Sequence, residues 1–305
     1  ALTFFVPTYA FPGFHQAPER YEPVIAALKR VKPISMKHQL LHKQLLSGRL
    51  QAFEDFRVIQ ASQRCHRPFT HHVSDSAIGD PLEQFEFEGR RFNRTLINYL
   101  LGLHYFKHHV ADAEDIQTVL EIGGGYGALG EIFLTNTDNN IFYIDIDIPP
   151  LSFIAAYYLR QRLGETAVGT DHALGMESAI AIDDLRQHYQ AIVLNAWHLP
   201  RLQGQVDLVI NFIAFQEMEP AVVTNYLQQI DRLSPKYILL RNLREGKPIA
   251  TSDKALGVRQ PIRSIDYDNG LKAYQLLDTN VVPFGQYHVD HFHSELRLYR
   301  RRHPS

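Results

Sequence analysis

The stretch VLEIGGGYGALGE, Val119 to Glu131, places four glycines within five positions, behind a short apolar run and ahead of a helix-like segment. Glycine lets the backbone turn tightly and approach a ligand without an obstructing Cβ. The helix that follows offers free N–H groups at its positive end. The stretch therefore predicts a strand, a ligand-binding turn and a helix in succession.

Short apolar runs alternate with helical segments after residue 115: TVLEI, ALGEIFL, IFYIDID, LSFIAAYYLRQRL, AIVLNAW, VDLVINF, AVVTNYLQQIDRL and YILLRNL. This alternation is typical of an α/β, Rossmann-like, doubly wound and mostly parallel sheet with helices on both faces. At the C-terminus we expect a helix at DNGLKAYQLLD and two late strands, around VVPFGQY and SELRLYR. These strands predict an antiparallel hairpin at the edge of the sheet.

The first 115 residues have a helical pattern instead. One stripe of apolar residues comprises Leu41, Leu45, Leu46, Leu50, Phe53 and Phe56, and a second comprises Phe92, Leu96, Leu100, Leu103 and Phe106. Both have the spacing of core helices. Because 305 residues exceed the usual single core of about 150 residues, we expect a helical N-terminal cap at residues 1–115 and a ligand-binding domain at residues 116–305.

Composition excludes some classes of function. The chain has 33 acidic and 31 basic side chains, a formal charge of -2, and one cysteine, Cys65. No nucleic-acid partner is implied by this balance. No window reaches the ~18 apolar residues of a membrane span, and the N-terminus lacks a basic signal-peptide region. We expect a soluble cytoplasmic protein.

Two ligands fit the glycine spacing. Gly125, Gly127 and Gly130 match GxGxxG, the dinucleotide pattern, with Asp147 as the ribose acid about 20 residues on. That register leaves Glu121 inside a buried strand without a partner, which is costly. The alternative register starts from Glu121 and Gly123 and places the acid at the end of the strand, where it can face the ammonium of S-adenosylmethionine.

EIGGGYG resembles the first motif of class I S-adenosylmethionine-dependent methyltransferases, and the likeness extends over roughly residues 90 to 300. FYIDIDIP is similar to that family's second strand, whose terminal acid holds the ribose hydroxyls. The resemblance implies a seven-stranded sheet. It implies these cofactor-binding residues: Glu121, Gly123, Gly125, Gly127, Asp145, Asp147, Asn195, Ala196 and Asn211. One departure is Asn195, which stands where the family usually has an acid.

Within the class, INFIAFQEM, YLQQIDRL and YILLRN are most similar to the sugar O-methyltransferases of natural-product and polysaccharide pathways. This likeness implies in-line methyl transfer to a hydroxyl of a sugar or glycosylated natural product. The cap at residues 1–115 would then recognise this small-molecule acceptor. Its aromatic residues are also compatible with a second subunit, so a homo-oligomer stays open.

A sugar hydroxyl needs a base to take its proton as the bond forms. The candidates are Glu217 behind the fourth strand, then His291 and His288 in QYHVDHFHSE, where Asp290 could orient an imidazole. His198 is better explained as a solvated or core histidine. The hairpin histidines match no common zinc pattern, so we expect no metal.

Two alternatives remain open from the sequence. An NAD-dependent oxidoreductase is the runner-up, against which Glu121 argues. A methyltransferase-like fold that has lost catalysis and acts as a binding protein is the other, although Glu121, the glycines and Asp147 are all present.

Overall fold

The computed structural model describes residues 9–10, 18–31, 35–61, 66–171, 179–252, 257–280, 286–287 and 293–302, with backbone only at 286–287 and 293. The chain divides into two compact units, Ala1–His104 and Tyr105–Ser305. The sequence placed this boundary at residue 115. That the first unit recognises an acceptor stays a prediction.

The N-terminal unit is mainly helical, with α1 (Pro18–Val31), α2 (Met36–Leu46), α3 (Arg49–Gln60) and the first part of α4 (Arg94–His109). A small antiparallel hairpin joins β1 (Phe85–Phe87) to β2 (Arg90–Phe92). Gly48 separates α2 from α3 with φ 75°, and a Cβ there would lie 2.2 Å from the carbonyl carbon of Tyr9. Glycine is therefore required at this break.

The two apolar stripes that were predicted as core differ in burial. Phe92, Leu96, Leu100, Leu103 and Phe106 are all fully buried, as expected. In the other stripe Phe56 is buried, but three side chains are exposed: Leu41 at 42%, Leu45 at 51% and Phe53 at 42%. The expectation of a core was wrong for these three: Leu41 and Leu45 belong to α2, which has no buried residue in the described chain, and Phe53 lies on the exposed side of α3.

The C-terminal unit is built on one large sheet, which confirms the predicted fold class. Its strands are β3 (Thr118–Ile122), β4 (Phe142–Asp147), β5 (Val168–Thr170), β7 (Ala191–Asn195), β9 (Leu208–Phe212), β10 (Tyr237–Leu243), β11 (Tyr274–Thr279), β12 (Gln286–Tyr287) and β13 (His293–Arg301). Their order is β11-β13-β10-β9-β3-β4-β7-β5, and β12 also pairs with β13. The short strands β5 and β12 raise the number in the described chain from the seven expected to nine.

All pairs from β10 to β5 are parallel, whereas β13 is antiparallel to both β10 and β11. The strand order reverses at β3. The strands that follow it in the chain, β4, β5 and β7, extend the sheet on one side of β3, and β9 and β10 extend it on the other side. Ligands in open α/β sheets bind beyond the carboxyl ends of the strands at such a reversal. The predicted glycine-rich turn follows β3 and therefore lies at this place.

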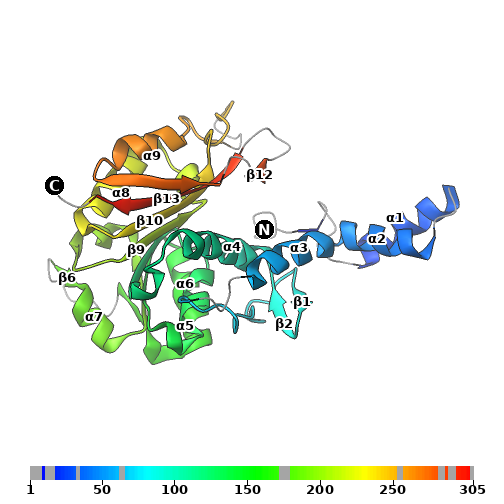
Figure 1. Ribbon diagram of the computed structural model, residues 1–305, viewed down its shortest axis with the longest axis horizontal. Helices are drawn as coiled ribbons and strands as arrows, with labels where there is room; N and C mark the ends of the chain where they lie inside the picture. The colour runs from blue at the N-terminus through cyan, green and yellow to red at the C-terminus, as the bar shows by residue number, and fades with distance from the viewer. Residues whose placement is uncertain are drawn as a thin grey trace. The chain divides into compact units, whose positions relative to one another are not determined.

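Helices cover both faces of the sheet. They are α5 (Ala128–Leu134), α6 (Leu151–Leu163), α7 (Ile182–His188), α8 (Pro220–Leu233) and α9 (Ser264–Gly270). Apolar residues of α7, α8 and α9 share one core with the strands. Figure 1 shows α8 and α9 on one side of the sheet and α5 and α6 on the other. The segments predicted as helices between the strands thus form the two layers that cover the sheet.

Several shorter elements complete the unit. The 3₁₀ turns are η2 (Ala113–Asp115), η3 (Thr137–Asn139), η4 (Glu165–Ala167), η6 (Ala196–Arg201) and η7 (Phe215–Glu217). A separate two-stranded parallel sheet pairs β6 (Ile180–Ala181) with β8 (Leu202–Gln203).

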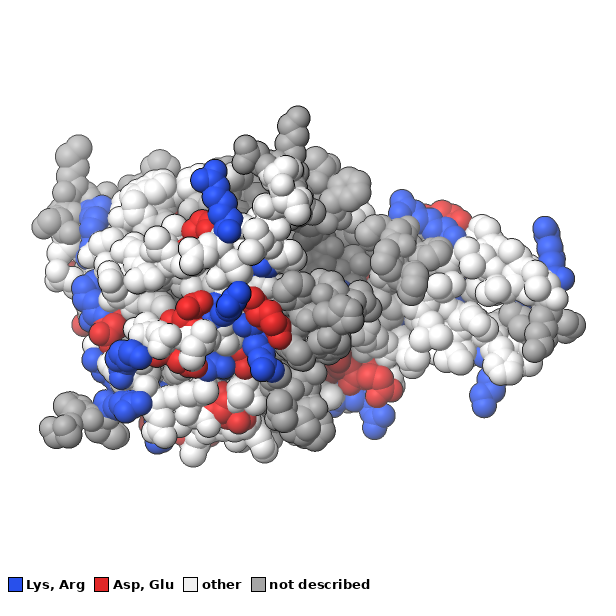
Figure 2. All heavy atoms as spheres, turned by 90° about the horizontal axis from the view of Figure 1, so that it is seen from above, with Lys and Arg blue, Asp and Glu red and all other residues white. Residues whose placement is uncertain are grey.

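In the described chain no helix combines the length and the apolarity needed to cross a membrane. Acidic and basic side chains are interspersed on the face seen in Figure 2.

The predicted helix at DNGLKAYQLLD was wrong. The helix α9 lies earlier, over residues 264–270, and residues 274–279 form the strand β11. The apolar spacing of YQLLD fits either structure, and pairing with β13 decides for the strand. The predicted strand SELRLYR lies within β13, which pairs antiparallel with β12 at residues 286–287 and with β11. The segment VVPFGQY lies outside the described residues except for β12.

A buried charge cluster fixes β13 to α9. The Arg297 guanidinium donates to both oxygens of Asp268 at 2.6 Å and to Glu295 Oε1 at 3.0 Å. Thr279 Oγ1 donates to the same Glu295 oxygen at 2.8 Å. The Arg297 and Glu295 side chains are 8% and 4% exposed. Such a cluster is stable only while every charge keeps its partner.

Arg297→Met is therefore expected to destabilise the protein by about 3 to 5 kcal/mol, because it leaves two carboxylates in a largely buried site without their cation. The matched control is Arg57→Met, which removes an exposed pair with Glu54 (3.8 Å) and should cost less than about 1 kcal/mol. Urea unfolding followed by circular dichroism measures both. Equal effects of the two substitutions would contradict the structural role of the cluster.

Candidate functional site

The glycine-rich turn lies directly on two carboxylates of β4. Gly124 N donates to Asp145 Oδ1 at 3.3 Å, and Gly125 N donates to Asp147 Oδ2 at 2.9 Å. A Cβ at Gly124 would lie 2.5 Å from Asp145 Oδ1. The close contact of bare backbone with these acids explains why the first glycines and the second-strand acids occur together.

Three glycines of the turn have left-handed backbone: Gly123, Gly125 and Gly127. Gly123 has φ 79°, and a Cβ there would lie 2.3 Å from the Cβ of Ala214. Gly125 has φ 65°, and apart from its chain neighbours no heavy atom of the described residues lies within 4 Å of where its Cβ would be. The first glycine thus permits close packing, whereas the second leaves open space beside a backbone N–H. That space is what a ligand approaching the turn would need.

Asp147 ends β4 at the carboxyl edge and is 6% exposed. Its Oδ1 accepts from Ile148 N at 2.7 Å, and its Oδ2 accepts from Gly125 N. Burial raises the pKa of Asp147, and these two backbone hydrogen bonds counteract the shift. Each oxygen can accept a second hydrogen bond. Asp147 is thus placed to receive two hydroxyl donors.

Asp145 lies two residues earlier on the same face and is fully buried. Its Oδ2 atom has no hydrogen-bond partner among the described residues. Burial, then the charges of Glu121 and Asp147, raise the pKa of Asp145 well above its ordinary value. A buried carboxyl in this setting favours its neutral form or a nearby cation.

Glu121 is opposite Asp145 in the parallel register of β3 and β4 and is fully buried. Its carboxylate accepts a hydrogen bond from the Tyr143 hydroxyl. The sequence argument against a dinucleotide assumed a strand carboxylate without a partner. Tyr143 supplies that partner, so this argument loses its force. What the structure adds is a second buried acid, Asp145, beside the first.

Asn195 ends β7, and Ala196 begins η6. Ser152 Oγ donates to Asn195 Oδ1 at 2.7 Å, and Asn195 Nδ2 donates to Asp171 Oδ2 at 2.6 Å. Asp171 directly follows β5 and was missed by the sequence analysis. An acid immediately after a strand is a detectable signal, but a strand of three residues was not recognised.

His198 lies in η6 close to the same acid. Its Nε2 is 3.9 Å from Asp171 Oδ2, and its Nδ1 is 2.9 Å from Arg201 Nη1. Burial and then the Arg201 charge lower the pKa of His198, and Asp171 opposes this shift. The sequence analysis explained His198 as a solvated or core histidine, and in the structure its side chain is 12% exposed.

Asn211 is near the tip of β9 and is fully buried. Its Nδ2 donates to Ile122 O at 2.8 Å. Its Oδ1 accepts from Phe215 N at 3.2 Å and from Asn242 Nδ2 at 3.0 Å. All its polar atoms are engaged within the protein, so Asn211 shapes the turn after β9 and its direct binding to a cofactor stays a prediction.

Glu217 ends η7 at the carboxyl edge, and its side chain is 51% exposed. Lys247 Nζ lies 2.8 Å from its Oε1, and Gln216 Nε2 donates to the same atom at 3.3 Å. Gln216 is itself fixed, because its Oε1 accepts from Leu243 N at 2.8 Å. The carboxylate is therefore oriented and accessible. Lys247 was not singled out from the sequence.

The other candidate bases, His291 and His288, lie outside the described residues, as does Asp290. His293 is described only as backbone in β13. In the part of the chain that the structure describes, no group of three or more potential ligand side chains could hold a metal ion.

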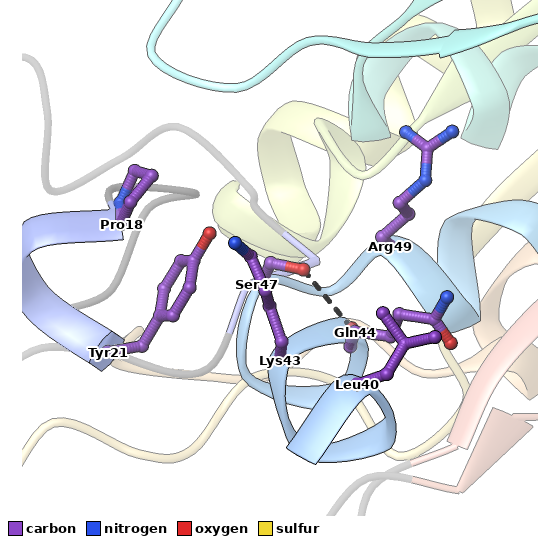
Figure 3. Close-up of a pocket in the computed structure, with 7 residues that line it drawn as sticks. All are labelled: Pro18, Tyr21, Leu40, Lys43, Gln44, Ser47 and Arg49. Carbon is purple, nitrogen blue, oxygen red and sulfur yellow. Dashed lines mark hydrogen bonds between the residues drawn. The ribbon is translucent and has the colours of Figure 1, made fainter. Parts of the chain in front are cut away.

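A cavity of about 400 Å³ lies in the N-terminal unit (Figure 3). Its lining residues are Pro18, Tyr21, Leu40, Lys43, Gln44, Ser47 and Arg49. None of these was a predicted site residue. The cavity has cations and a phenol but no carboxylate, so the chemistry at the carboxyl edge of the sheet is the better guide to the candidate site.

No family model and no curated protein sequence matches this chain. Among solved structures, the mitomycin 7-O-methyltransferase MmcR is 14% identical with a TM-score of 0.40, over 68% of this chain and 58% of that one. Magnesium protoporphyrin IX methyltransferase (ChlM) from Synechocystis PCC 6803 with bound SAM is 11% identical, with a TM-score of 0.41, over 88% and 99%. The N-terminal domain of EvdMO1 with SAH bound is 9% identical, with a TM-score of 0.43, over 83% and 97%. Likenesses this distant do not decide the reaction or the ligand.

Asp145→Asn is expected to stabilise the ligand-free protein at high pH. The folded-state pKa of Asp145 is raised above its ordinary value of 3.8, so the folded protein holds a proton that the unfolded chain has released. The stability of the wild type due to this group is lost as the pH rises through the folded pKa. A neutral amide removes that loss, so the variant should gain about 1 to 3 kcal/mol at pH 8.

Urea unfolding between pH 4 and pH 8 measures this difference, which should shrink towards pH 4. The exposed carboxyl of Asp138 provides the control, and Asp138→Asn should show little change. A gain that is the same at every pH would mean that ionisation of Asp145 is not its cause.

Proposed function

We propose that the protein is an S-adenosylmethionine-dependent O-methyltransferase that acts on a hydroxyl of a sugar or glycosylated natural product. The observation that carries the proposal is the arrangement at the tips of β3 and β4. An open glycine turn adjoins Asp147 at the edge and the buried acids Asp145 and Glu121 behind it. These carboxyl groups accept hydrogen bonds and favour positive charge, so they suit a ligand with ribose hydroxyls, an ammonium group and a sulfonium.

The residues present fit this cofactor. Asp147 would accept from the ribose hydroxyls, and the acidic pair would favour the cationic methionine end by charge. Ile148 and Trp197 are apolar side chains at the ends of β4 and β7 that are 56% and 59% exposed. They suit the two faces of a nucleobase. When bound, the cofactor supplies an electrophilic methyl group on its sulfur.

The acceptor oxygen would have to lie in line with that methyl group. Glu217 is our first choice for the base that takes its proton, since its carboxylate is accessible and oriented by Gln216 and Lys247. The N-terminal unit is our choice for acceptor recognition. No metal enters the proposed mechanism.

An NAD-dependent oxidoreductase is the second candidate, and one observation favours it. A Cβ at Gly130 would lie 2.7 Å from the ring of Tyr143, so this glycine permits the close helix–sheet packing required of the third glycine in GxGxxG. The sheet argues the other way. The dinucleotide fold has the order 3-2-1-4-5-6, whereas here the antiparallel β13 separates β10 from β11.

Calorimetry with S-adenosylhomocysteine and NAD in parallel tests the choice of ligand. We expect S-adenosylhomocysteine to bind and NAD not to bind. Asp147→Ala should weaken binding tenfold or more, because two charge-assisted hydrogen bonds are lost at roughly 1.5 to 3 kcal/mol each at most. Unchanged affinity in Asp147→Ala, with a large loss in Asp145→Ala, would assign the ribose to the other acid. If NAD binds and S-adenosylhomocysteine does not, the oxidoreductase is favoured. If S-adenosylhomocysteine binds but no acceptor is methylated, a non-catalytic binding protein is favoured.

Glu217→Gln is expected to lower kcat by about 10²- to 10⁴-fold on an identified acceptor, with cofactor affinity intact, because the proton is removed only in the transition state. Lys247→Met is the companion variant and should lower kcat less than Glu217→Gln, since it removes one of the two groups that orient the carboxylate but leaves the carboxylate in place. Turnover is measured as S-adenosylhomocysteine release. If alanine at Glu217, His288 and His291 each kept kcat within a few-fold of wild type, the base would have to be sought elsewhere.

A further inference from the structure

Ile213, the residue after β9, has a left-handed backbone with φ 73°. Residues other than glycine rarely adopt this conformation, and for a β-branched side chain it is a true outlier. The other non-glycine residues of the described chain with positive φ are Asp80, Glu88, Asn140 and Ser234. None of these is β-branched, so Ile213 is the costly case.

Hydrogen bonds on both sides hold Ile213 in this conformation. Its own N–H donates to Arg241 O at 2.6 Å. The next residues are fixed by buried amides: Phe215 N donates to Asn211 Oδ1 at 3.2 Å, and Gln216 N donates to Asn242 Oδ1 at 3.1 Å. Disfavoured backbone persists where surrounding contacts over-determine it, and it concentrates at binding sites.

The position of Ile213 gives it access to the candidate site. Its neighbour Ala214 lies against Gly123, the first left-handed glycine of the turn after β3. The strands β3 and β9 are adjacent, and the strand order reverses here. The Ile213 side chain is 40% exposed, although Phe212 and Phe215 on either side are 6% and 0% exposed. An apolar surface is thus left open beside the glycine turn.

We propose that Ile213 is an apolar binding residue for the ligand held between the tips of β3 and β9, and that the protein keeps its left-handed conformation for this contact at the expense of stability. The inference rests on the proposed function and deepens it. The acids of β3 and β4 would hold the polar and cationic groups of the cofactor. Ile213 would face an apolar part, such as the carbon–sulfur chain.

The test compares Ile213→Gly, Ile213→Ala and Ile213→Asn by thermal unfolding and by calorimetry with S-adenosylhomocysteine. Alanine still carries the cost of a left-handed backbone and glycine does not, so the glycine variant should melt higher than the alanine variant by roughly 2 to 4 °C. All three variants should bind S-adenosylhomocysteine about three- to tenfold more weakly than wild type, because each lacks the apolar side chain.

Val58 provides the matched control, because it is β-branched, 56% exposed and within the helix α3. There the order should reverse, with Val58→Ala melting higher than Val58→Gly, and binding should be unchanged in both. Asparagine adopts the left-handed region readily, so Ile213→Asn keeps the binding test valid if the smaller side chains disturb folding.

Two results would overturn this inference and leave the proposed function intact. One is wild-type affinity in all three Ile213 variants, and the other is an alanine variant that melts as high as the glycine variant. Failure of the wild-type protein to bind S-adenosylhomocysteine would instead remove the proposed function, and this inference with it.

Discussion

Two backbone N–H groups that donate to two carboxylates, Gly124 to Asp145 and Gly125 to Asp147, connect the turn after β3 to the end of β4. Carboxylates on the inner face of a sheet are unfavourable unless something compensates their burial. Here the bare backbone of the turn compensates in part, and Asp145 keeps one oxygen without a partner among the described residues. The glycines and the acids therefore depend on each other, and the rest of the unit holds β3 and β4 in the register that brings them together.

The far edge of the sheet is stabilised differently. There β13 is antiparallel to β10 and β11, and the Arg297 side chain joins β13 to α9 through its hydrogen bonds to Asp268. The same strand begins at the carboxyl edge, beside the end of β10. The antiparallel strand β13 is thus inserted between β10 and β11, and the turn that carries Ile213 and Glu217 follows β9 at the carboxyl edge.

Much of the fold could be predicted because the parallel strands β3, β4, β7 and β9 are almost wholly buried and appear in the sequence as short, mostly apolar runs. The common face of Asp145 and Asp147 followed from strand alternation. The strand YQLLDT could not be distinguished from a helix, because five apolar-rich residues fit both periods and β13 decides between them. The three-residue strand β5 is too short to show any period, and the acid behind it was missed for that reason.

The candidate site was predictable to a similar degree. Acids and glycines at strand ends are visible as residue types, and the structure places Asp147 and Gly125 in contact. Partners that come from elsewhere in the chain are not visible in this way. Tyr143 supplies the hydrogen bond to Glu121 and Lys247 the ion pair with Glu217, because of tertiary packing. The left-handed backbone of Ile213 could not be predicted either, because isoleucine is not a residue type that marks this conformation.

The helix α2 has 11 residues, and none of them is buried. Isolated helices shorter than about 12 to 15 residues are marginal in water, and tertiary packing normally provides the remaining stability. We therefore expect this helix to open at little cost, with fast amide exchange and early cleavage by proteases. Substitutions there can reshape the surface of the N-terminal unit while the strands that carry the acids keep their register.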